Sequence, residues 1–288
     1  MKKLTLGKEI IDIPESWNDL TAEQLLYISR VTYDQMNINV FKFNLFRNIT
    51  GIQVKKHRLF IGGAYCYRIS YKKKIYVIDL EELTMLMEEL FRFIFKTQTR
   101  NREEHTFIDS NLVKQLLPVI KHRFRKYYGP ADGLSNIVFE EYISAVCSYH
   151  RYTKTQDTKH IDMLIATLYR RGRDKKEAEL AGDTRLPFND NVVEKQSLRF
   201  KNLDAAVKTA IMYFFSGSIE NLKRLFPAVF TGAGSAGNSD PFFSYMELTD
   251  ALAKYDITKK TEIRKSLLFD VLSTLNNMII QSKSKKTK

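Results

Sequence analysis

The residues with the greatest potential for chemistry lie in the stretch QDTKHIDMLIATLYRRGR, residues 156–173. It places Asp157, His160 and Asp162 close together, and His150 precedes them. Two histidines and a carboxylate could hold a zinc ion or exchange protons. However, Asp157 occupies a helix N-cap position, and the side chains of His160 and Asp162 point to different faces of a helix. We therefore expect no metal and no cofactor.

The same stretch ends in a group of cations that could bind an anionic partner. Cations at the end of a helix also have a structural explanation, because they face exposed backbone carbonyl groups. Two further lysines extend the group beyond the helix, which favours a binding role. The candidate anion-binding residues are Arg170, Arg171, Arg173, Lys175 and Lys176.

A glycine-rich segment, GAGSAG at residues 232–237, has the spacing of a dinucleotide-binding turn. Such a turn must follow a strand and open a helix. Here Pro227 interrupts the preceding segment, and Pro241 prevents an early helix. We interpret residues 231–240 as a Gly/Ser linker. The chain also lacks the P-loop, G-x-S-x-G and H-E-x-x-H motifs, so we expect no enzymatic activity.

The composition indicates a folded protein with a substantial core. The 288 residues are 44% hydrophobic and 12% aromatic, which excludes disorder for most of the chain. The two cysteines, Cys66 and Cys147, have no C-x-x-C spacing, which argues against a disulfide framework and fits a reducing cytoplasm. The N-terminal segment lacks an apolar core, and no apolar run reaches about 18 residues. We therefore expect neither a signal peptide nor a membrane span.

The formal net charge of +13 is spread over many small groups of lysine and arginine. Dispersed charge is typical of a solvated surface. We therefore expect binding to nucleic acid to be weak and nonspecific, because base-reading modules are missing. Beside the candidate residues above, the groups are Lys55, Lys56 and Arg58; Lys72 to Lys74; Lys121, Arg123, Arg125 and Lys126; and the tail KSKKTK.

The first residues predict strand and helix in alternation. The segment KLTLGKEIIDIP alternates in polarity and predicts one strand that ends at Pro14. Thr21 and Gln24 have the spacing of a capping box, so a helix should begin near Thr21. A second helix is expected over residues 38–50, because Gly51 can end it.

The next segment, AYCYRISYKKKIYVID at residues 64–79, predicts a β-hairpin with a charged turn. Asp79 should then cap a helix whose apolar residues keep a period of about 3.6. The fold class expected from this order is mainly α (α+β): an N-terminal strand, helices and a β-hairpin, followed by a multi-helix bundle.

From about residue 110 onward the pattern predicts helices only. The segment NLVKQLLPVIKHRFRKYY, residues 111–128, predicts a helix that Pro118 kinks. Residues 136–170 predict an antiparallel pair of helices whose apolar faces lie in the main core. The later expected elements are a polar loop at 172–188, a helix from Leu203 that Gly217 ends, a short helix from Ser218 to Pro227, and helices at 242–255 and 259–282.

These elements predict four regions, and the last of them has two interpretations. The apolar sector of helix 259–282 is wider than a surface helix needs, so the helix either binds a partner or docks on its own core. The lysine tail beyond it should be disordered. The candidate partner-binding residues are Ile263, Leu267, Leu268, Val271, Leu272, Leu275 and Met278. The regions are 1–110, α+β; 111–230, a helical core; 231–240, the linker; and 241–288, a helical pair with a basic tail.

Five segments occur in this order: IPESWNDLTAEQLLYI, HIDMLIATLYRRGR, RLPFND, FFSGSIENLKRLFPAVF and SLLFDVLSTLN. Together they resemble proteins from the tail modules of phages and prophages of gut Bacteroidetes, from residue 8 to about residue 277. The hairpin near residues 62–78 is not part of this pattern. The resemblance implies a virion component or a morphogenesis factor in a host cytoplasm, and it carries over no catalytic residues.

We therefore expect a non-enzymatic phage tail or neck protein, either a structural part of the virion or an assembly chaperone. Its partners would be other tail or neck proteins or further copies of itself, and no membrane. The alternative is a DNA-associated phage protein that binds nucleic acid nonspecifically through its basic groups. An enzyme is the third and least supported alternative.

Overall fold

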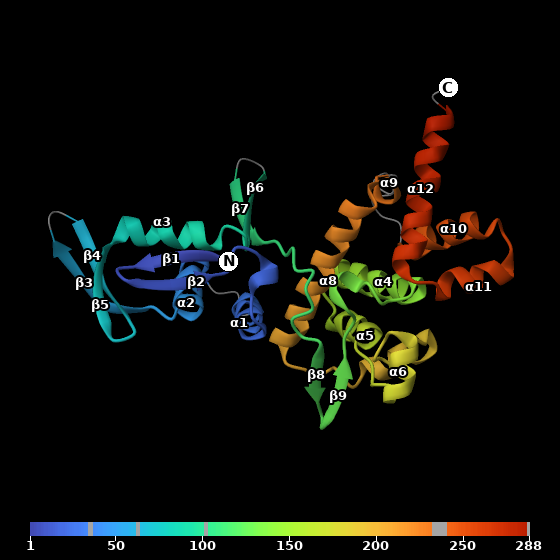
Figure 1. Ribbon diagram of the computed structural model, residues 1–288, viewed down its shortest axis with the longest axis horizontal. Helices are drawn as coiled ribbons and strands as arrows, with labels where there is room; N and C mark the ends of the chain where they lie inside the picture. The colour runs from blue at the N-terminus through green and yellow to red at the C-terminus, as the bar shows by residue number, and fades with distance from the viewer. Residues whose placement is uncertain (34–36, 62–63, 101–102, 232–240, 287–288) are drawn as a thin grey trace. The chain divides into compact units, whose positions relative to one another are not determined.

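The computed structural model divides the chain into two compact units (Figure 1). Unit 1 comprises residues 1–112 and 205–210, and unit 2 comprises residues 113–204 and 211–288. The fold is mainly α with some β structure, as predicted. No helix among the described residues is long and apolar enough to span a membrane. The structure describes residues 1–33, 37–61, 64–100, 103–231 and 241–286.

Unit 1 begins with a hairpin in place of the single strand that we predicted. Strand β1 (Lys2–Leu6) pairs antiparallel with β2 (Glu9–Ile13). The prediction was wrong because Gly7 interrupts the alternating pattern. Gly7 adopts a φ of 62°, a left-handed conformation that glycine reaches without strain, so the chain reverses at that point.

The next helices of unit 1 begin and end where their capping residues predict. Thr21 and Gln24 exchange the two hydrogen bonds of a capping box, at 2.9 and 3.2 Å. The helix that follows is α1 (Ala22–Tyr33), after a short 3-10 turn at Trp17–Asp19. Helix α2 (Ile38–Thr50) ends at Gly51, which has a φ of 70°.

The predicted charged hairpin is present and belongs to a three-stranded sheet. Its strands are β3 (Gln53–Ile61), β4 (Ala64–Tyr71) and β5 (Lys74–Asp79), in the order β3-β4-β5. Asp79 then caps α3 (Leu80–Phe91) by accepting a hydrogen bond from the backbone amide of Glu82, at 2.7 Å. The sequence pattern therefore located both the hairpin and the helix start correctly.

A further hairpin of unit 1, which we did not predict, joins β6 (Phe95–Arg100) to β7 (Glu103–Ile108). Trp17 lies beside the ends of this hairpin and is buried. Its indole Nε1 lies 3.0 Å from the carbonyl oxygen of Phe93 and 2.9 Å from that of Asp109. The indole thus satisfies two backbone acceptors where the hairpin leaves and rejoins the core.

Unit 2 begins with a hairpin in place of the predicted helix over residues 111–128. Strands β8 (Val119–His122) and β9 (Arg125–Tyr128) pair antiparallel. The helix prediction was wrong for two reasons. Pro118 lacks an amide hydrogen for a helix, and the backbone of β9 finds a distant partner: Tyr128 and Arg170 exchange hydrogen bonds at 2.7 and 3.1 Å.

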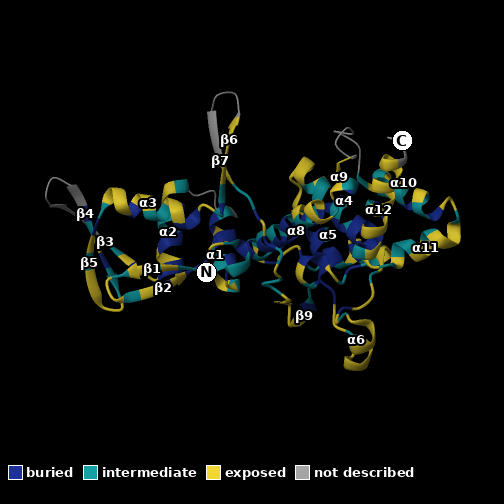
Figure 2. Cartoon of the chain, turned by 45° about the horizontal axis from the view of Figure 1, so that its top comes forward, coloured by how far each residue is buried: buried dark blue, intermediate teal, exposed yellow. Residues whose placement is uncertain are grey.

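Two antiparallel helices form the centre of unit 2, as predicted. They are α4 (Phe139–Thr155) and α5 (Thr158–Leu168). Leu164 is 1% exposed, which confirms that the paired apolar faces lie in the core. Figure 2 shows the buried residues of unit 2 gathered on these helices and on the start of α12. Flanking turns and helices are the 3-10 turns at Asp132–Leu134 and Asp190–Val192, α6 (Lys175–Ala181) and α7 (Val193–Ser197).

One long helix, α8 (Ala205–Leu225), replaces the two that we predicted around Gly217. Gly217 does not end the helix, because its neighbours Phe214, Phe215 and Leu222 are all buried. Burial of three large side chains outweighs the cost of about 1 kcal/mol for a glycine inside a helix. The short helix α9 (Pro227–Phe230) then starts with its proline in the first turn.

Three helices complete the chain, where we predicted two: α10 (Pro241–Ala253), α11 (Ile257–Lys265) and α12 (Leu268–Lys286). The helix predicted over residues 259–282 is broken at Ser266, because the backbone there pairs with the first residue of α4 and with the segment just before it. The amide of Phe139 donates to Ser266 at 2.9 Å, and the amide of Leu268 donates to Ile137 at 2.9 Å. The predicted disordered tail is helical as far as Lys286, and the GAGSAG segment lies outside the described residues.

Candidate functional site

The carboxylate at the start of α5 caps the helix. Asp157 is the N-cap, and its Oδ1 accepts a hydrogen bond from the backbone amide of Lys159 at 2.9 Å. His160 follows in the first turn, and Asp162 is buried. Within the described part of the chain, no three His, Cys, Asp or Glu side chains gather closely enough to hold a metal ion. The expected lack of a metal stays a prediction that elemental analysis can test.

The predicted cation group is divided by the structure, beginning with Arg170. This residue is 6% exposed and therefore does not present its charge on the surface as predicted. Its Nη1 lies 2.8 Å from Oε1 of Glu141, and its Nε donates to the carbonyl oxygen of Leu186 at 2.7 Å. A guanidinium at this depth requires a carboxylate partner, because an unpaired buried charge is very costly.

Arg185 is the second cation of this buried cluster and is itself fully buried. Its Nη1 lies 2.6 Å from Glu141 Oε1, and its Nη2 lies 2.9 Å from Asp183 Oδ2. Burial lowers the pKa of the Arg185 guanidinium, but the charges of Glu141 and Asp183 outweigh it, so the pKa is raised above its ordinary value. Two cations and two carboxylates thus form a balanced network. We call Glu141, Arg170, Asp183 and Arg185 the buried ion cluster.

The buried ion cluster fixes an extended segment between β9 and residues 184–186. The backbone of Arg170 pairs with Tyr128, and Gly172 forms a bridge with Arg185. Arg173 donates its backbone amide to Thr184 at 2.9 Å, and its side-chain Nε donates to the carbonyl oxygen of Arg185. Arg173 therefore also has a structural partner.

A pocket of about 270 Å³ opens beside this segment and has a cationic lining. Arg171 and Arg199 line it together with Arg170, whose guanidinium lies 5.8 Å from the ring centroid of Phe188. No carboxylate is among its described lining residues, so the pocket fits a small anionic group beside apolar surface. The lining consists of Tyr127, Ala166, Arg170, Arg171, Leu186, Pro187, Phe188, Asn189, Val192, Val193, Gln196 and Arg199.

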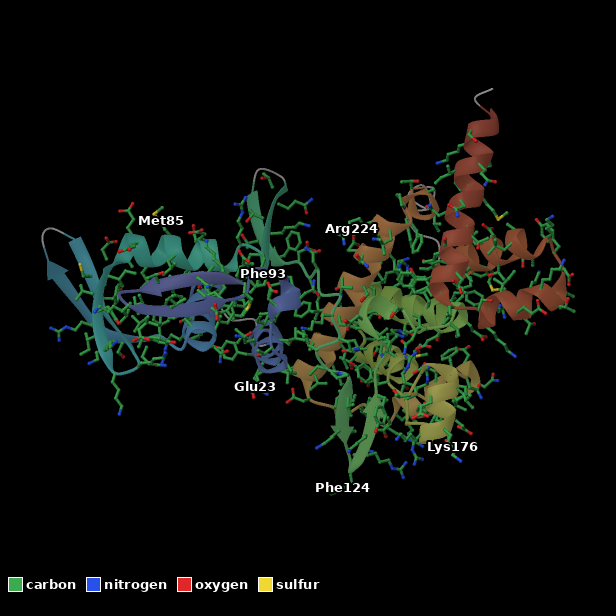
Figure 3. All side chains as sticks on the ribbon, in the orientation of Figure 1. Glu23, Met85, Phe93, Phe124, Lys176 and Arg224 are labelled. Atoms are coloured by element: carbon green, nitrogen blue, oxygen red, sulfur yellow. The ribbon has the colours of Figure 1, made fainter. Side chains whose placement is uncertain are left out.

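The two lysines of the predicted cation group lie elsewhere. Lys175 and Lys176 are exposed on α6, a helix with no buried residue, and do not line the pocket. Figure 3 shows Lys176 on this helix. Of the five predicted anion-binding residues, Arg171 is thus the one that is both exposed and part of the pocket. We predicted one continuous group, with the arginines at a helix end and the lysines just beyond it, whereas the structure distributes these residues over a strand-like segment and a separate helix.

Most of the candidate partner-binding residues near the C-terminus are buried in unit 2. Leu268 and Leu272 are 0% exposed, and Val271 and Leu275 are also buried. This burial contradicts a partner-binding role for these four residues and supports the alternative that the helix docks on its own core. Leu267 and Met278 are each 46% exposed, and Ile263 is half-buried.

Sequence reasoning missed Glu141, Arg185 and Arg199. Glu141 resembles any acidic residue in the first turn of a helix, where the dipole alone explains it. Arg185 begins the segment RLPFND, which is part of the resemblance described above. No pattern in the sequence, however, indicates that Arg185 is buried.

Comparison of the chain with models of known protein families, with curated proteins and with solved structures found no match.

Proposed function

We propose that the chain is a non-enzymatic phage tail or neck protein that acts through protein–protein contacts. The proposal rests on the sequence resemblance described above and on the roles of the residues that could have done chemistry. Asp157 caps a helix, and Glu141, Arg170 and Arg185 hold one another inside the core. These side chains therefore have structural roles. This supports a protein that acts by binding.

The observation that best supports a binding role is the outer strand β5 of unit 1. Among the described residues, β5 pairs with β4 alone, so its other backbone edge has no strand partner. Ile75 and Val77 point to the same face of β5 and are 57% and 54% exposed. A free edge with exposed apolar side chains is a template for a strand from another chain. We assign this edge to another tail or neck protein or to a second copy of this chain.

Helix α3 of unit 1 carries further exposed apolar side chains. Leu80 and Met85 of α3 are 38% and 66% exposed, and Met85 lies on the helix that follows β5 directly (Figure 3). Methionine is flexible and adapts to irregular partner surfaces. We call Ile75 and Val77 the β5 surface.

The double variant Ile75→Lys/Val77→Lys tests the β5 surface in a phage that encodes this chain. In a phage that lacks the wild-type copy, the variant should fail to restore infectious particles, because lysines block strand addition at an edge. The matched control is Val40→Lys, which changes an exposed residue (48%) on α2 and should restore the titre. Full restoration by the double variant would contradict this role for β5.

The virion or the host cytoplasm is the proposed location. Mass spectrometry of purified virions separates the two forms of the proposal: abundant peptides indicate a structural component, and their absence indicates an assembly chaperone.

The second candidate function, a DNA-associated phage protein, is supported by the exposed cations of the hairpin β8–β9.

A further inference from the structure

The hairpin β8–β9 carries a high density of positive charge and no negative charge. Its residues 119–128 include Lys121, Arg123, Arg125 and Lys126, and no carboxylate. All four cations are exposed. In the described part of the chain, none of them forms an ion pair.

One face of the hairpin is anchored to unit 2 through Tyr127, and Arg125 lies on this face opposite His122. Tyr127 is buried, with its ring centroid 4.9 Å from that of Phe200, and His122 lies on the same face of the ribbon. On the opposite face, Lys121 and Lys126 are direct cross-strand partners. Like charges directly opposite each other destabilise a hairpin. A bound anion between them would remove this repulsion.

The tip of the hairpin is strained and exposes an aromatic ring. Arg123 and Phe124 form the turn with φ values of 46° and 63°, a conformation that asparagine and glycine adopt with much less strain. The Phe124 side chain is fully exposed and points away from the ribbon (Figure 3). Neither the turn geometry nor the core of unit 2 requires a phenylalanine at this position.

The hairpin β4–β5 of unit 1 provides a comparison within the same chain. Its turn residues Lys72 and Lys73 have nearly the same φ values, 46° and 67°. There, however, Glu9 lies 3.2 Å from the Lys72 amine and 2.7 Å from the Lys74 amine. Part of the charge of that turn is balanced within the protein, whereas the charge of β8–β9 is left for a partner.

We propose that β8–β9 is an arm that binds single-stranded nucleic acid. Its four cations bind successive phosphates, and Phe124 stacks on an unpaired base. Arginine at the tip suits this partner, because a guanidinium forms paired hydrogen bonds with phosphate oxygens. An anionic membrane fits less well, since a membrane-binding element has several apolar residues and this tip has only Phe124. The arm goes beyond the proposed protein–protein function and reads no base sequence.

Fluorescence anisotropy with a labelled oligothymidine of about 20 nucleotides tests the arm in the full chain. Four phosphate contacts predict that affinity falls about fiftyfold between about 50 and 200 mM salt. The variant Lys121→Ala/Arg123→Ala/Arg125→Ala/Lys126→Ala should bind at least tenfold more weakly at low salt. Its plot of log affinity against log salt should be shallower by about three.

A charge-matched control separates a specific arm from general attraction. The variant Lys55→Ala/Lys72→Ala/Lys73→Ala/Lys74→Ala also removes four cations, which lowers the formal net charge from +13 to +9 (13 − 4 = 9). This control should bind the oligonucleotide within about twofold of the wild type. An equal loss in both four-residue variants would overturn the proposal, because net charge alone would explain it.

The single variant Phe124→Ala tests stacking without changing the charge. It should weaken binding to oligothymidine about tenfold and leave binding to a duplex of equal length nearly unchanged, because duplex bases are already stacked. Unchanged oligothymidine binding would overturn the role of Phe124. Phe124-dependent binding to phosphatidylglycerol vesicles, without binding to the oligonucleotide, would overturn nucleic acid as the partner.

Discussion

The Nη1 atom of Arg185 lies 2.6 Å from Oε1 of Glu141, and both side chains are almost completely buried. The two residues are 44 positions apart, so this contact joins α4 to the segment that follows α6. Arg170 shares the same carboxylate oxygen at 2.8 Å. One carboxylate therefore organises two guanidinium groups, and these in turn hold the backbone that supports β9 and the cationic pocket.

The variant Glu141→Gln tests the importance of this carboxylate. It keeps the shape of the side chain but leaves two buried guanidinium groups to share Asp183. Breaking a buried ion pair in this way should lower the free energy of unfolding by about 3–5 kcal/mol. Urea unfolding of the full chain, with a probe in unit 2, measures the change.

The control for this variant is Glu220→Gln, which makes the same substitution at an exposed ion pair with Lys223. It should cost less than about 1 kcal/mol. A loss of that small size in Glu141→Gln as well would show that the buried ion cluster does not stabilise unit 2.

Four tyrosines of unit 2 predict a loss of stability at alkaline pH. Burial is the largest cause that raises the pKa of Tyr142, Tyr149, Tyr169 and Tyr245 above the ordinary value of 10.0. A raised pKa in the folded state means that the neutral phenol is favoured there. The stability is therefore fully present below about pH 10 and is lost as the pH rises above it.

The substitution Tyr142→Phe should shift the alkaline unfolding midpoint to higher pH, because it removes the phenol with a strongly raised pKa. Circular dichroism during a pH titration measures the midpoint, and phenolate absorbance follows the ionisation. Tyr255→Phe is the control, since Tyr255 is 77% exposed and its loss should leave the midpoint unchanged. Equal midpoints for Tyr142→Phe and the wild type would contradict the prediction.

Helix α12 should stabilise unit 2 through its buried side chains. Leu272→Ala should lower the free energy of unfolding by about 2–5 kcal/mol, because Leu272 is 0% exposed. Ile280→Ala, at a residue that is 51% exposed on the same helix, should change it by less than about 0.5 kcal/mol. Truncation at Asp256 should unfold unit 2. A truncated chain that keeps a cooperative unfolding transition of unit 2 would restore the partner-binding interpretation.

Elemental analysis of protein purified without a chelator tests the expected lack of a metal. Zinc, iron and manganese should each be far below one atom per chain. One bound metal that disappears in the double variant His150→Ala/His160→Ala would show instead that these histidines are ligands.

Local signals in the sequence predicted many element boundaries of this fold. The capping box of Thr21 and Gln24, the stop at Gly51 and the N-cap Asp79 all depend on neighbours within four residues, so a short window contains the information. The hairpin of α4 and α5 was predictable for a similar reason, because its apolar period is regular and its connection is short.

Two of the failures share a physical cause, which is pairing between distant segments. The backbone of Tyr128 binds Arg170, and the amide of Phe139 binds Ser266. These contacts turned one predicted helix into β8–β9 and broke another before α12. The buried ion cluster failed to appear for the same reason, since Glu141 and Arg185 meet only after the chain has folded. Charge alone gave no sign that Arg170 is inside.

The most direct test of the central claim is to inactivate the gene for this chain in a phage that encodes it and to examine the particles by electron microscopy. A non-enzymatic tail or neck protein predicts DNA-filled heads with missing or incomplete tails, and restoration by the wild-type chain supplied from a plasmid. Particles with complete tails and normal infectivity in the absence of the chain would contradict the account.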